Sequence, residues 1–250
     1  MTLVFTVSPD FNTKYLPGWF VVNTWLQRHL GVATHFEVFD GFDDLHRSME
    51  AGSIDIIYAN PFDAARLVRD FGYVAVARPV GRADEAVIAS LASGSVQHVE
   101  DLQPGTRIAT TDDPDVHMMC MIMIEPADLN ATNVAMQRRD NYVLVAKSLL
   151  KGEADIGFFL AETFDELSGP IKNQLHVLVR SQIYVINHVL LAHPRLGDQI
   201  DTLRASVLGM AAEPKGAMAL QDVNIQGWEA LDQEEVEFMI DLMVALTVTG

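Results

Sequence analysis

Carboxylate, imidazole and sulfur side chains crowd into one short segment, TDDPDVHMMCMIM, from Thr111 to Met123. Asp112, Asp113 and Asp115 precede a predicted helix, where carboxylates favour the positive helix end and cap free N–H groups. The same groups could contact a cationic or hydroxylated ligand or a metal ion. They would repel a phosphate unless it is protonated or a nearby arginine compensates. Capping is the simpler interpretation.

The predicted helix after these carboxylates carries ligands of soft metals, because thioether, thiol and imidazole suit Cu(I). His117 and Met121 share a helix face with Cys120 near both, but the other methionines spread around the helix. Since methionine fills irregular cores, we expect a buried helix and no metal site. Cys120 is the single cysteine, which rules out an internal disulfide. We expect it to be an inert buried thiol and not a nucleophile.

Two further polar groups lie on predicted strands. Arg138 and Arg139 end a strand, and the carboxyl ends of strands are where α/β sheets bind ligands. Arg139 suits a carboxylate or oxyanion through a bidentate contact. His188 lies in the apolar stretch VINHVLL. A histidine there is either a satisfied core residue or part of a concave, partly polar site.

Aromatic side chains near the first predicted loop divide into two groups. We expect Tyr15 to be able to reach a ligand, and Trp19 and Phe20 to belong to the core. Trp228 and Phe238, late in the chain, are predicted to pack as well. The sequence contains no G-x-S-x-G, Walker loop, H-E-x-x-H or Rossmann glycine fingerprint. We therefore expect no catalytic residues and no cofactor.

The composition narrows the class of protein. The 250 residues are 49% hydrophobic, which predicts a folded globular chain. A net charge of −17 argues against nucleic-acid binding, which needs clustered Lys and Arg. No apolar run approaches the roughly 18 residues of a membrane span. The N-terminus shows no signal-peptide pattern, so we expect a cytoplasmic protein, or a periplasmic one whose export signal has been removed.

Two stretches one hundred positions apart are alike: residues 40–67 and 140–167. Each predicts a helix, a glycine stop, a short apolar strand and a second helix. Such a repeat indicates two similar α/β lobes with a cleft between them. The matching pairs are Asp40 and Asp140, Phe42 and Tyr142, Arg47 and Lys147, Ser48 and Ser148, Gly52 and Gly152, Asp55 and Asp155, and Ile56 and Ile156.

Strands and helices alternate along the chain, which favours βαβ units and largely parallel sheets. The C-terminal part has no counterpart in the first unit, so we expect it to return to lobe 1. This predicts lobe 1 from residues 1–84 and 186–250, lobe 2 from 85–185, and hinge crossings near 82–86 and 181–188. Predicted strands cover residues 3–8, 35–39, 54–59, 73–79 and 106–111 with an extended stretch at 183–194, and predicted helices include 17–30, 140–151, 196–210 and 233–246.

Several motifs resemble those of PhnD-like phosphate/phosphonate-binding proteins of ABC transporters, which are type 2 periplasmic solute-binding proteins. They are GSIDIIYANPFDAA, GEADIGFF, the Arg-Asp pair before the helix at 140–151, and VINHVLLAHPRL. The resemblance covers almost the whole chain. It implies a two-lobed α/β fold in which each lobe is a mostly parallel sheet flanked by helices, with a two-strand hinge.

The resemblance also implies where a ligand would sit. In the family, a Ser/Thr-rich turn at the start of a second-lobe helix holds the phosphonate oxygens, as suits a helix N-terminus. Here the matching turn, residues 110–117, carries carboxylates, a valine and a histidine. Arg139 stands where the family often has a histidine, and His188 stands where an aspartate is common. The scaffold is retained and the ligand chemistry is altered.

The sequence thus predicts a solute-binding protein that closes on an oxyanion or a phosphate/phosphonate-like compound, for ABC-type uptake or sensing, without catalysis. We expect a monomer that binds a small molecule and partners an ABC permease or a sensor. A bilobal enzyme, or a cytoplasmic sensor or metal-binding protein that uses the His/Met/Cys-rich helix, is the alternative. The predicted ligand-binding residues are Tyr15, Tyr58, Asn60, Thr111, Asp113, His117, Arg139, Asn187 and His188.

Overall fold

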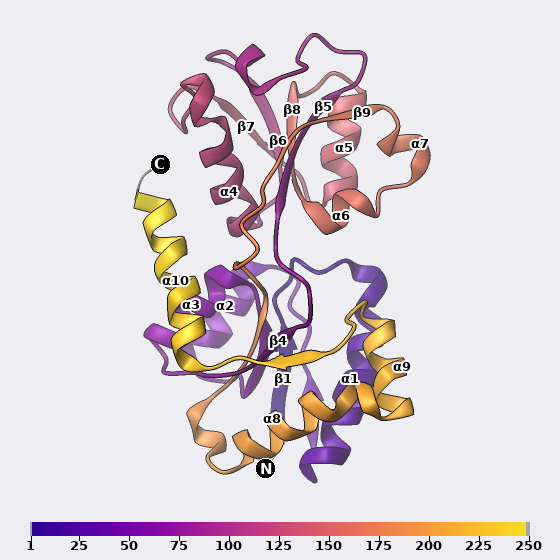
Figure 1. Cartoon of the computed structure of the whole chain (residues 1–250), viewed down its shortest axis with the longest axis vertical. Coiled ribbons are helices and arrows are strands. Elements are labelled where there is room, and N and C mark those ends of the chain that lie inside the picture. Colours follow the sequence, from indigo (N-terminus) through magenta and orange to yellow (C-terminus); the bar gives the residue numbers. More distant parts are fainter. Residues whose placement is uncertain (1, 249–250) are drawn as a thin grey trace. The chain divides into compact units, whose positions relative to one another are not determined.

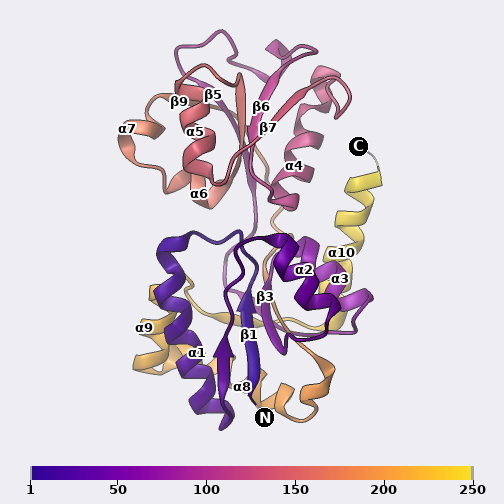
Figure 2. The same ribbon diagram turned by 180° about the vertical axis from the view of Figure 1, so that it is seen from behind.

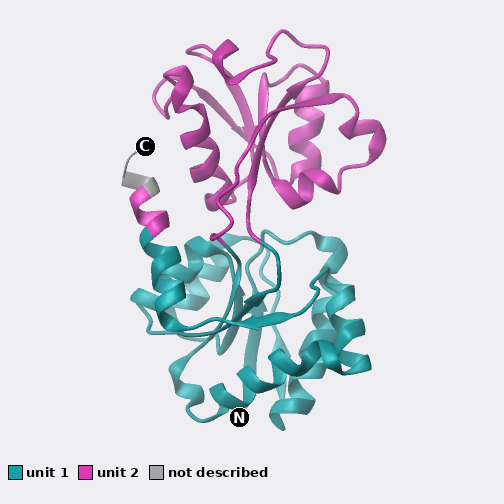
Figure 3. Cartoon of the chain, in the orientation of Figure 1, with its two compact units in different colours: residues 1–82, 187–241 teal, residues 83–186, 242–250 magenta. Residues whose placement is uncertain are grey.

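The computed structural model describes residues 2–248, with side chains to residue 245, and the chain divides into two compact units (Figure 3). Lobe 1 runs to Arg82 and resumes from Asn187 to Asp241, and lobe 2 runs from Ala83 to Ile186. The described end of the C-terminal helix α10 (Gln233–Val248), from Leu242, is assigned to the unit of lobe 2, whereas the whole helix was predicted from the sequence to belong to lobe 1. The predicted lobe bounds also include residues 1, 249 and 250, which lie outside the described part.

Lobe 1 is built on a six-stranded sheet in the order β11-β4-β10-β3-β1-β2. β1 pairs in parallel with β2 and β3, whereas β10 is antiparallel to both β3 and β4, and β11 is antiparallel to β4. β1 to β4 therefore share one direction. The strands are β1 (Leu3–Val7), β2 (Thr34–Phe36), β3 (Ile56–Ala59), β4 (Val74–Pro79), β10 (Val189–Ala192) and β11 (Trp228–Ala230).

Helices cover both faces of the lobe 1 sheet (Figure 2). α1 (Leu16–Leu30), α8 (Gln199–Gly209) and α9 (Pro214–Asp222) share one core with the sheet. α2 (Phe42–Glu50), α3 (Pro61–Arg69) and the start of α10 share the other. Tyr58 of β3 belongs to the first core and Ile57 to the second. This alternation is the period of a strand buried on both faces.

Lobe 2 has a five-stranded sheet in the order β7-β6-β8-β5-β9. β6 is parallel to β7 and β8, and β5 is antiparallel to β8 and β9. Helices α4 and α5 lie on opposite sides of this sheet (Figure 1). The strands are β5 (Ala86–Leu91), β6 (Arg107–Thr110), β7 (Ala135–Arg138), β8 (Ile156–Leu160) and β9 (Leu175–Arg180), and the helices are α4 (Pro114–Ile124), α5 (Tyr142–Leu150), α6 (Ala161–Asp165) and α7 (Gly169–Lys172).

The predicted α/β fold is confirmed, and both sheets prove to be mixed. The reversed strands include β5, by which the chain enters lobe 2, and β10, by which it re-enters lobe 1. Neither β5 nor β11 was predicted from the sequence. The predicted extended stretch at 183–194 forms a strand only in β10. Tyr184 interrupts it with a φ of 61°, and Glu85 Oε1 accepts the N–H groups of Ile183 and Tyr184 instead of a neighbouring strand.

Two aromatic side chains differ from their predicted core positions. Phe20 is 49% exposed and Phe238 is 62% exposed, whereas Trp19 and Trp228 are buried as predicted. Phe20 follows Trp19 by one residue, and about 100° of rotation per residue carries it off the buried face of α1. Its ring still packs edge-on against Phe36.

The internal repeat has a physical basis in two equivalent carboxylates. Asp55 Oδ2 accepts the backbone N–H of Val4 at 2.7 Å, and Asp155 Oδ2 accepts the backbone N–H of Arg107 at 2.8 Å. Each aspartate also donates its own N–H to the carbonyl of the residue that it holds. The aspartate before β3 therefore fastens the start of β1, and the aspartate before β8 fastens the start of β6.

An arginine donates to the second oxygen of each carboxylate, but the two arginines lie on different elements of their lobes. Arg195 Nε donates to Asp55 Oδ1 at 2.6 Å, from the segment after β10. Arg107 Nη2 donates to Asp155 Oδ1 at 2.6 Å, from β6 itself. The Asp55 side chain is 4% exposed and that of Asp155 is 34% exposed. The carboxylate of the lobe 1 pair is therefore shielded from water, and that of the lobe 2 pair is partly exposed.

The difference in exposure predicts different costs for removing each charge. We expect Asp55→Asn to lower the free energy of unfolding by about 3 kcal/mol, because it removes the charge of a buried carboxylate and leaves Arg195 without its ion-pair partner. Asp155→Asn should cost about 1 kcal/mol, because water screens this pair. Urea denaturation of both variants against the wild type measures these values. Equal losses would contradict this interpretation.

The Asp155 contribution should also depend on pH. The hydrogen bond from Arg107 outweighs partial burial and holds the pKa of the Asp155 carboxyl below its usual range. Because the folded pKa is depressed, the stabilisation is complete above the unfolded pKa of about 4 and fades as the pH falls through the folded pKa. The stability difference between wild type and Asp155→Asn should therefore shrink below about pH 4.

Candidate functional site

Polar side chains gather at one edge of the lobe 1 sheet. Ser8 and Asp10 follow β1, and Asn60 follows β3, its parallel neighbour. β10 runs antiparallel to β3, so His188, just before β10, comes to the same edge. The carboxyl ends of parallel strands are the usual place for a ligand in an α/β sheet.

Asp10 and His188 form an ion pair at this edge. His188 Nε2 lies 3.1 Å from Asp10 Oδ2, and the Asp10 side chain is 2% exposed. Burial alone raises the pKa of the Asp10 carboxyl, but the charge and hydrogen bond of His188, with the nearby Asn60, hold it below its usual range. Asp10 is therefore ionised at neutral pH. The His188 ring packs against Tyr58, with 5.1 Å between ring centroids.

Asn60 is held in place by the start of α3. It caps this helix, and its Oδ1 accepts the backbone N–H of Asp63 at 2.7 Å. Ser8 Oγ accepts the backbone N–H of Asn60 at 3.1 Å and donates to Asp63 Oδ2 at 3.0 Å. His46 Nε2 lies 2.7 Å from the other oxygen of Asp63. This network fixes both the backbone and the side chain of Asn60.

The other predicted residues of lobe 1 are more varied in their surroundings. Tyr58 is buried, and its ring packs against those of Trp19 at 5.3 Å and Trp228 at 5.6 Å. Tyr15 is half-buried, and Lys14 Nζ lies 4.6 Å from the centre of its ring. Asn187 is buried. Their roles in ligand binding stay predictions.

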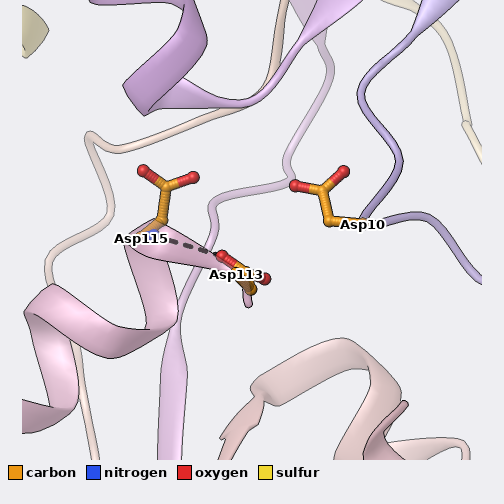
Figure 4. A group of neighbouring side chains, drawn as sticks. All are labelled: Asp10, Asp113 and Asp115. Atoms are coloured by element: carbon orange, nitrogen blue, oxygen red, sulfur yellow. Dashed lines mark hydrogen bonds between the residues drawn. The ribbon is translucent and has the colours of Figure 1, made fainter. Parts of the chain in front are cut away.

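In lobe 2 one of the carboxylates at the start of α4, that of Asp113, caps the helix itself (Figure 4). Asp113 is the N-cap, and its Oδ1 accepts the N–H groups of Asp115 at 3.1 Å and Val116 at 3.2 Å. Tyr142 Oη donates to Asp113 Oδ2 at 2.7 Å. The capping interpretation is thus confirmed for Asp113. The helix end that favours an anion already holds a carboxylate of the chain.

Two more predicted residues flank this cap. Thr111 is half-buried, and its Oγ1 accepts the backbone N–H of Asp113 at 3.4 Å. His117 lies on the first turn of α4. Burial, and to a lesser degree the charge of Arg138, lower the pKa of the His117 imidazole below its usual value. His117 is therefore neutral at neutral pH.

Arg139 makes contacts from all three of its guanidinium nitrogens within lobe 2. Nε donates to Ser148 Oγ at 2.7 Å, Nη2 to Gln137 Oε1 at 2.8 Å, and Nη1 to the Arg138 carbonyl at 2.9 Å. Glu153 adds an ion pair at 3.5 Å. These contacts fix the guanidinium. The bidentate contact from Arg139 to an oxyanion stays a prediction.

The sulfur-rich helix is buried, as expected. Met119 and Cys120 lie in the lobe 2 core, and Met118, Met121 and Met123 pack against it. Burial raises the pKa of the Cys120 thiol well above its usual value. A protonated thiol inside an apolar core is a poor nucleophile and a poor metal ligand.

Asp10 was not among the ligand-binding residues predicted from the sequence. A signal was present in the equivalence of the two lobes. Asp10 follows Ser8 by two positions, and Asp113 follows Thr111 by two positions, each after the first parallel strand of its lobe. Asp63 and His46 were also missed, because the contacts of the Asp63 side chain with Ser8 and His46 form only in the tertiary structure.

Comparisons with known proteins agree with this arrangement. A family model described as the periplasmic phosphonate substrate-binding protein of ABC transporters matches residues 5–236. PhnD1 from Prochlorococcus marinus, in complex with methylphosphonate, has a TM-score of 0.81 at 12% identity, covering 98% of both chains. A binding-protein component of an ABC phosphonate transporter from Pseudomonas aeruginosa has a TM-score of 0.78 at 13% identity, covering 99% of this chain and 88% of its own.

A sulfonate-binding protein shares the fold as well. The alkanesulfonate-binding protein SsuA from Xanthomonas axonopodis pv. citri, bound to MOPS, has a TM-score of 0.65 at 14% identity, covering 100% of this chain and 94% of its own. At these identities the structural likenesses show the two-lobed fold. No curated protein sequence matches the chain.

The Asp113 cap leads to a stability prediction. Asp113→Ala should lower the free energy of unfolding by about 1–2 kcal/mol, because it removes the acceptor for two N–H groups and for the Tyr142 hydroxyl. Asp113→Ser should cost less, because a serine hydroxyl also caps a helix. Urea denaturation followed by circular dichroism measures both. An Asp113→Ala variant as stable as the wild type would contradict the role of the cap.

The buried thiol predicts low reactivity. In the native protein at pH 8, Cys120 should not react with an aromatic disulfide reagent over minutes, because its pKa is raised and its sulfur is inaccessible. In concentrated urea one equivalent should react at once. The absorbance of the released thiolate measures both rates. Fast reaction of the native protein would show that α4 leaves the core readily.

Proposed function

We propose that this chain, which belongs to the family of phosphonate-binding periplasmic substrate-binding proteins of ABC transporters, binds a small phosphonate-like or phosphate-like oxyanion and releases it unchanged for uptake. The family match over residues 5–236 carries this proposal. The fold it shares with a methylphosphonate complex supports the ligand class. The buried polar groups at the carboxyl edge of the lobe 1 sheet support a ligand site there.

Residues from both lobes would contribute to binding. In lobe 1, the fixed positions of Asn60 and His188 favour them as ligand contacts, with Tyr15, Tyr58 and Asn187 as neighbours. In lobe 2, Thr111, His117 and Arg139 are the proposed contacts, and Asp113 positions the turn that carries them. The chain passes between the lobes at 82–83 and 186–187. We propose that these two crossings allow the lobes to close on the ligand.

The setting of this activity follows from the same family. We propose that the chain works as a monomer in the periplasm and delivers its ligand to an ABC permease. Within residues 2–248, no helix is long and apolar enough to cross a membrane. We also propose that the protein has no catalytic step, so a bound ligand should be recovered chemically unchanged.

Isothermal titration calorimetry with methylphosphonate and inorganic phosphate tests this function. We expect saturable binding at a single site to the wild type. Asn60→Ser should weaken binding by about tenfold, because serine keeps the helix cap but removes the amide donor. Asp70→Asn, a change of an exposed carboxylate at the end of α3, is the matched control and should bind as the wild type does.

Two further measurements accompany the titration. Phosphorus NMR after long incubation should show the added ligand unchanged, and turnover would favour the enzyme alternative. Small-angle scattering should show a smaller radius of gyration with ligand if the lobes close. If neither oxyanion gives heat or a thermal shift with the wild type, the proposed function is wrong.

A further inference from the structure

Two buried polar atoms at the carboxyl edge of the lobe 1 sheet have no hydrogen-bond partner among the described residues. They are Asp10 Oδ1 and Asn60 Nδ2. Buried polar groups are almost always paired, because leaving one unpaired costs free energy. Their residues lie close together, since Asn60 helps to lower the pKa of the Asp10 carboxyl. Even so, no hydrogen bond of normal geometry joins the two atoms.

The surrounding contacts decide what each atom can do. Asp10 Oδ2 is held by His188 at 3.1 Å, and the carboxylate is ionised, so Oδ1 can only accept a hydrogen bond. Asn60 Oδ1 accepts the Asp63 N–H at 2.7 Å. This contact fixes which end of the amide is oxygen, so the free end is Nδ2, which can only donate. The edge therefore offers one acceptor beside one donor.

Few chemical groups complement this pair. A fully ionised oxyanion can accept from Asn60 Nδ2, but it has no hydrogen for Asp10 Oδ1 and is repelled by the carboxylate. An ammonium group can donate to Asp10, but it cannot accept from Asn60. An O–H group does both, because it donates its hydrogen and accepts through its oxygen. A protonated phosphonate or phosphate presents such a group as P–OH.

We propose that Asp10 and Asn60 form a subsite that recognises a proton on the bound oxyanion, and that this chain thereby selects phosphonates and phosphates over sulfonates of the same shape. The inference rests on the proposed function and names the group that the site recognises. A phosphate-type group loses its second proton only near neutral pH, with a pKa of about 6 in phosphoserine. A sulfonic acid is a strong acid, so the sulfonate anion carries no proton to donate.

Buried hydrogen-bonding groups can discriminate strongly in this way. A site built to receive a hydrogen from its ligand rejects an analogue that lacks the hydrogen, because its acceptor is then desolvated and unpaired. In this chain the carboxylate charge adds repulsion of the fully ionised analogue. The same fold also occurs in an alkanesulfonate-binding protein. The scaffold therefore does not exclude sulfonates, and side chains such as Asp10 must do so.

A matched pair of ligands tests this proposal: methylphosphonate and methanesulfonate, measured by calorimetry at pH 6.5. For the wild type we expect methanesulfonate to bind at least about 100-fold more weakly than methylphosphonate. Asp10→Asn should reduce this preference to about tenfold or less, because the new amide can turn its NH2 group toward a sulfonate oxygen.

Two other variants separate the roles of the atoms. Asn60→Ser should weaken methylphosphonate by about tenfold while the preference over methanesulfonate persists, because Asp10 is unchanged. Asp70→Asn should leave both affinities as in the wild type. Circular dichroism and thermal denaturation establish that each variant is folded. The preference of the wild type for methylphosphonate over methanesulfonate is measured without any substitution, so it does not depend on how a variant folds.

The possible outcomes separate this proposal from the function on which it rests. Methanesulfonate binding as tightly as methylphosphonate to the wild type would overturn the subsite. An undiminished preference in folded Asp10→Asn would also overturn it, and would leave the binding function standing. If the wild type binds neither ligand, phosphate included, the proposed function is wrong and the subsite falls with it.

Discussion

The sheet inside each lobe depends on one kind of interaction, in which a carboxylate joins the starts of two parallel strands. Asp55 does this for β1 and β3, and Asp155 does it for β6 and β8. Each carboxylate accepts a backbone N–H that the neighbouring strand would otherwise leave unpaired, and an arginine holds its second oxygen. Because the starts of the strands are aligned, their carboxyl ends finish at one edge. That edge carries the polar residues of each lobe.

The polar edges of the two sheets share one sequence pattern, but the aspartate of that pattern makes different contacts in each lobe. Ser8 follows β1 and Thr111 follows β6, and an aspartate stands two positions after each hydroxyl residue. In lobe 2 that aspartate is Asp113, and its two oxygens accept hydrogen bonds from its own helix and from the Tyr142 hydroxyl. In lobe 1 the α-helix after β1 is α1, which begins only at Leu16 with Tyr15 at its N-cap, so Asp10 does not cap it. One oxygen of Asp10 pairs with His188, and the other is left to contact a ligand.

Family membership and ligand chemistry come from different parts of the chain. The resemblance predicted from motifs such as GSIDIIYANPFDAA and GEADIGFF is confirmed by the family match over residues 5–236. Those motifs include Asp55 and Asp155, which maintain the sheets. Asp113 and His188, which by the resemblance depart from the family pattern, lie at the start of α4 and just before β10. Neither residue belongs to the apolar cores of the two lobes.

The sequence by itself determined the alternation of strands and helices, the repeat, the capping role of Asp113 and the buried state of α4, because hydrophobic periodicity and helix capping act over a few neighbouring residues. It also indicated Asn60 and His188 as candidate ligand-binding residues. Only the tertiary structure decided that Asp10 pairs with His188, 178 positions away. It also decided that the Arg139 guanidinium donates hydrogen bonds to Ser148 and Gln137. The antiparallel orientation of β5 to β8 and of β10 to β3 was likewise decided by the tertiary structure. Contacts between residues far apart in sequence leave no local pattern, since burial and strand order bring them together only when the lobe is complete.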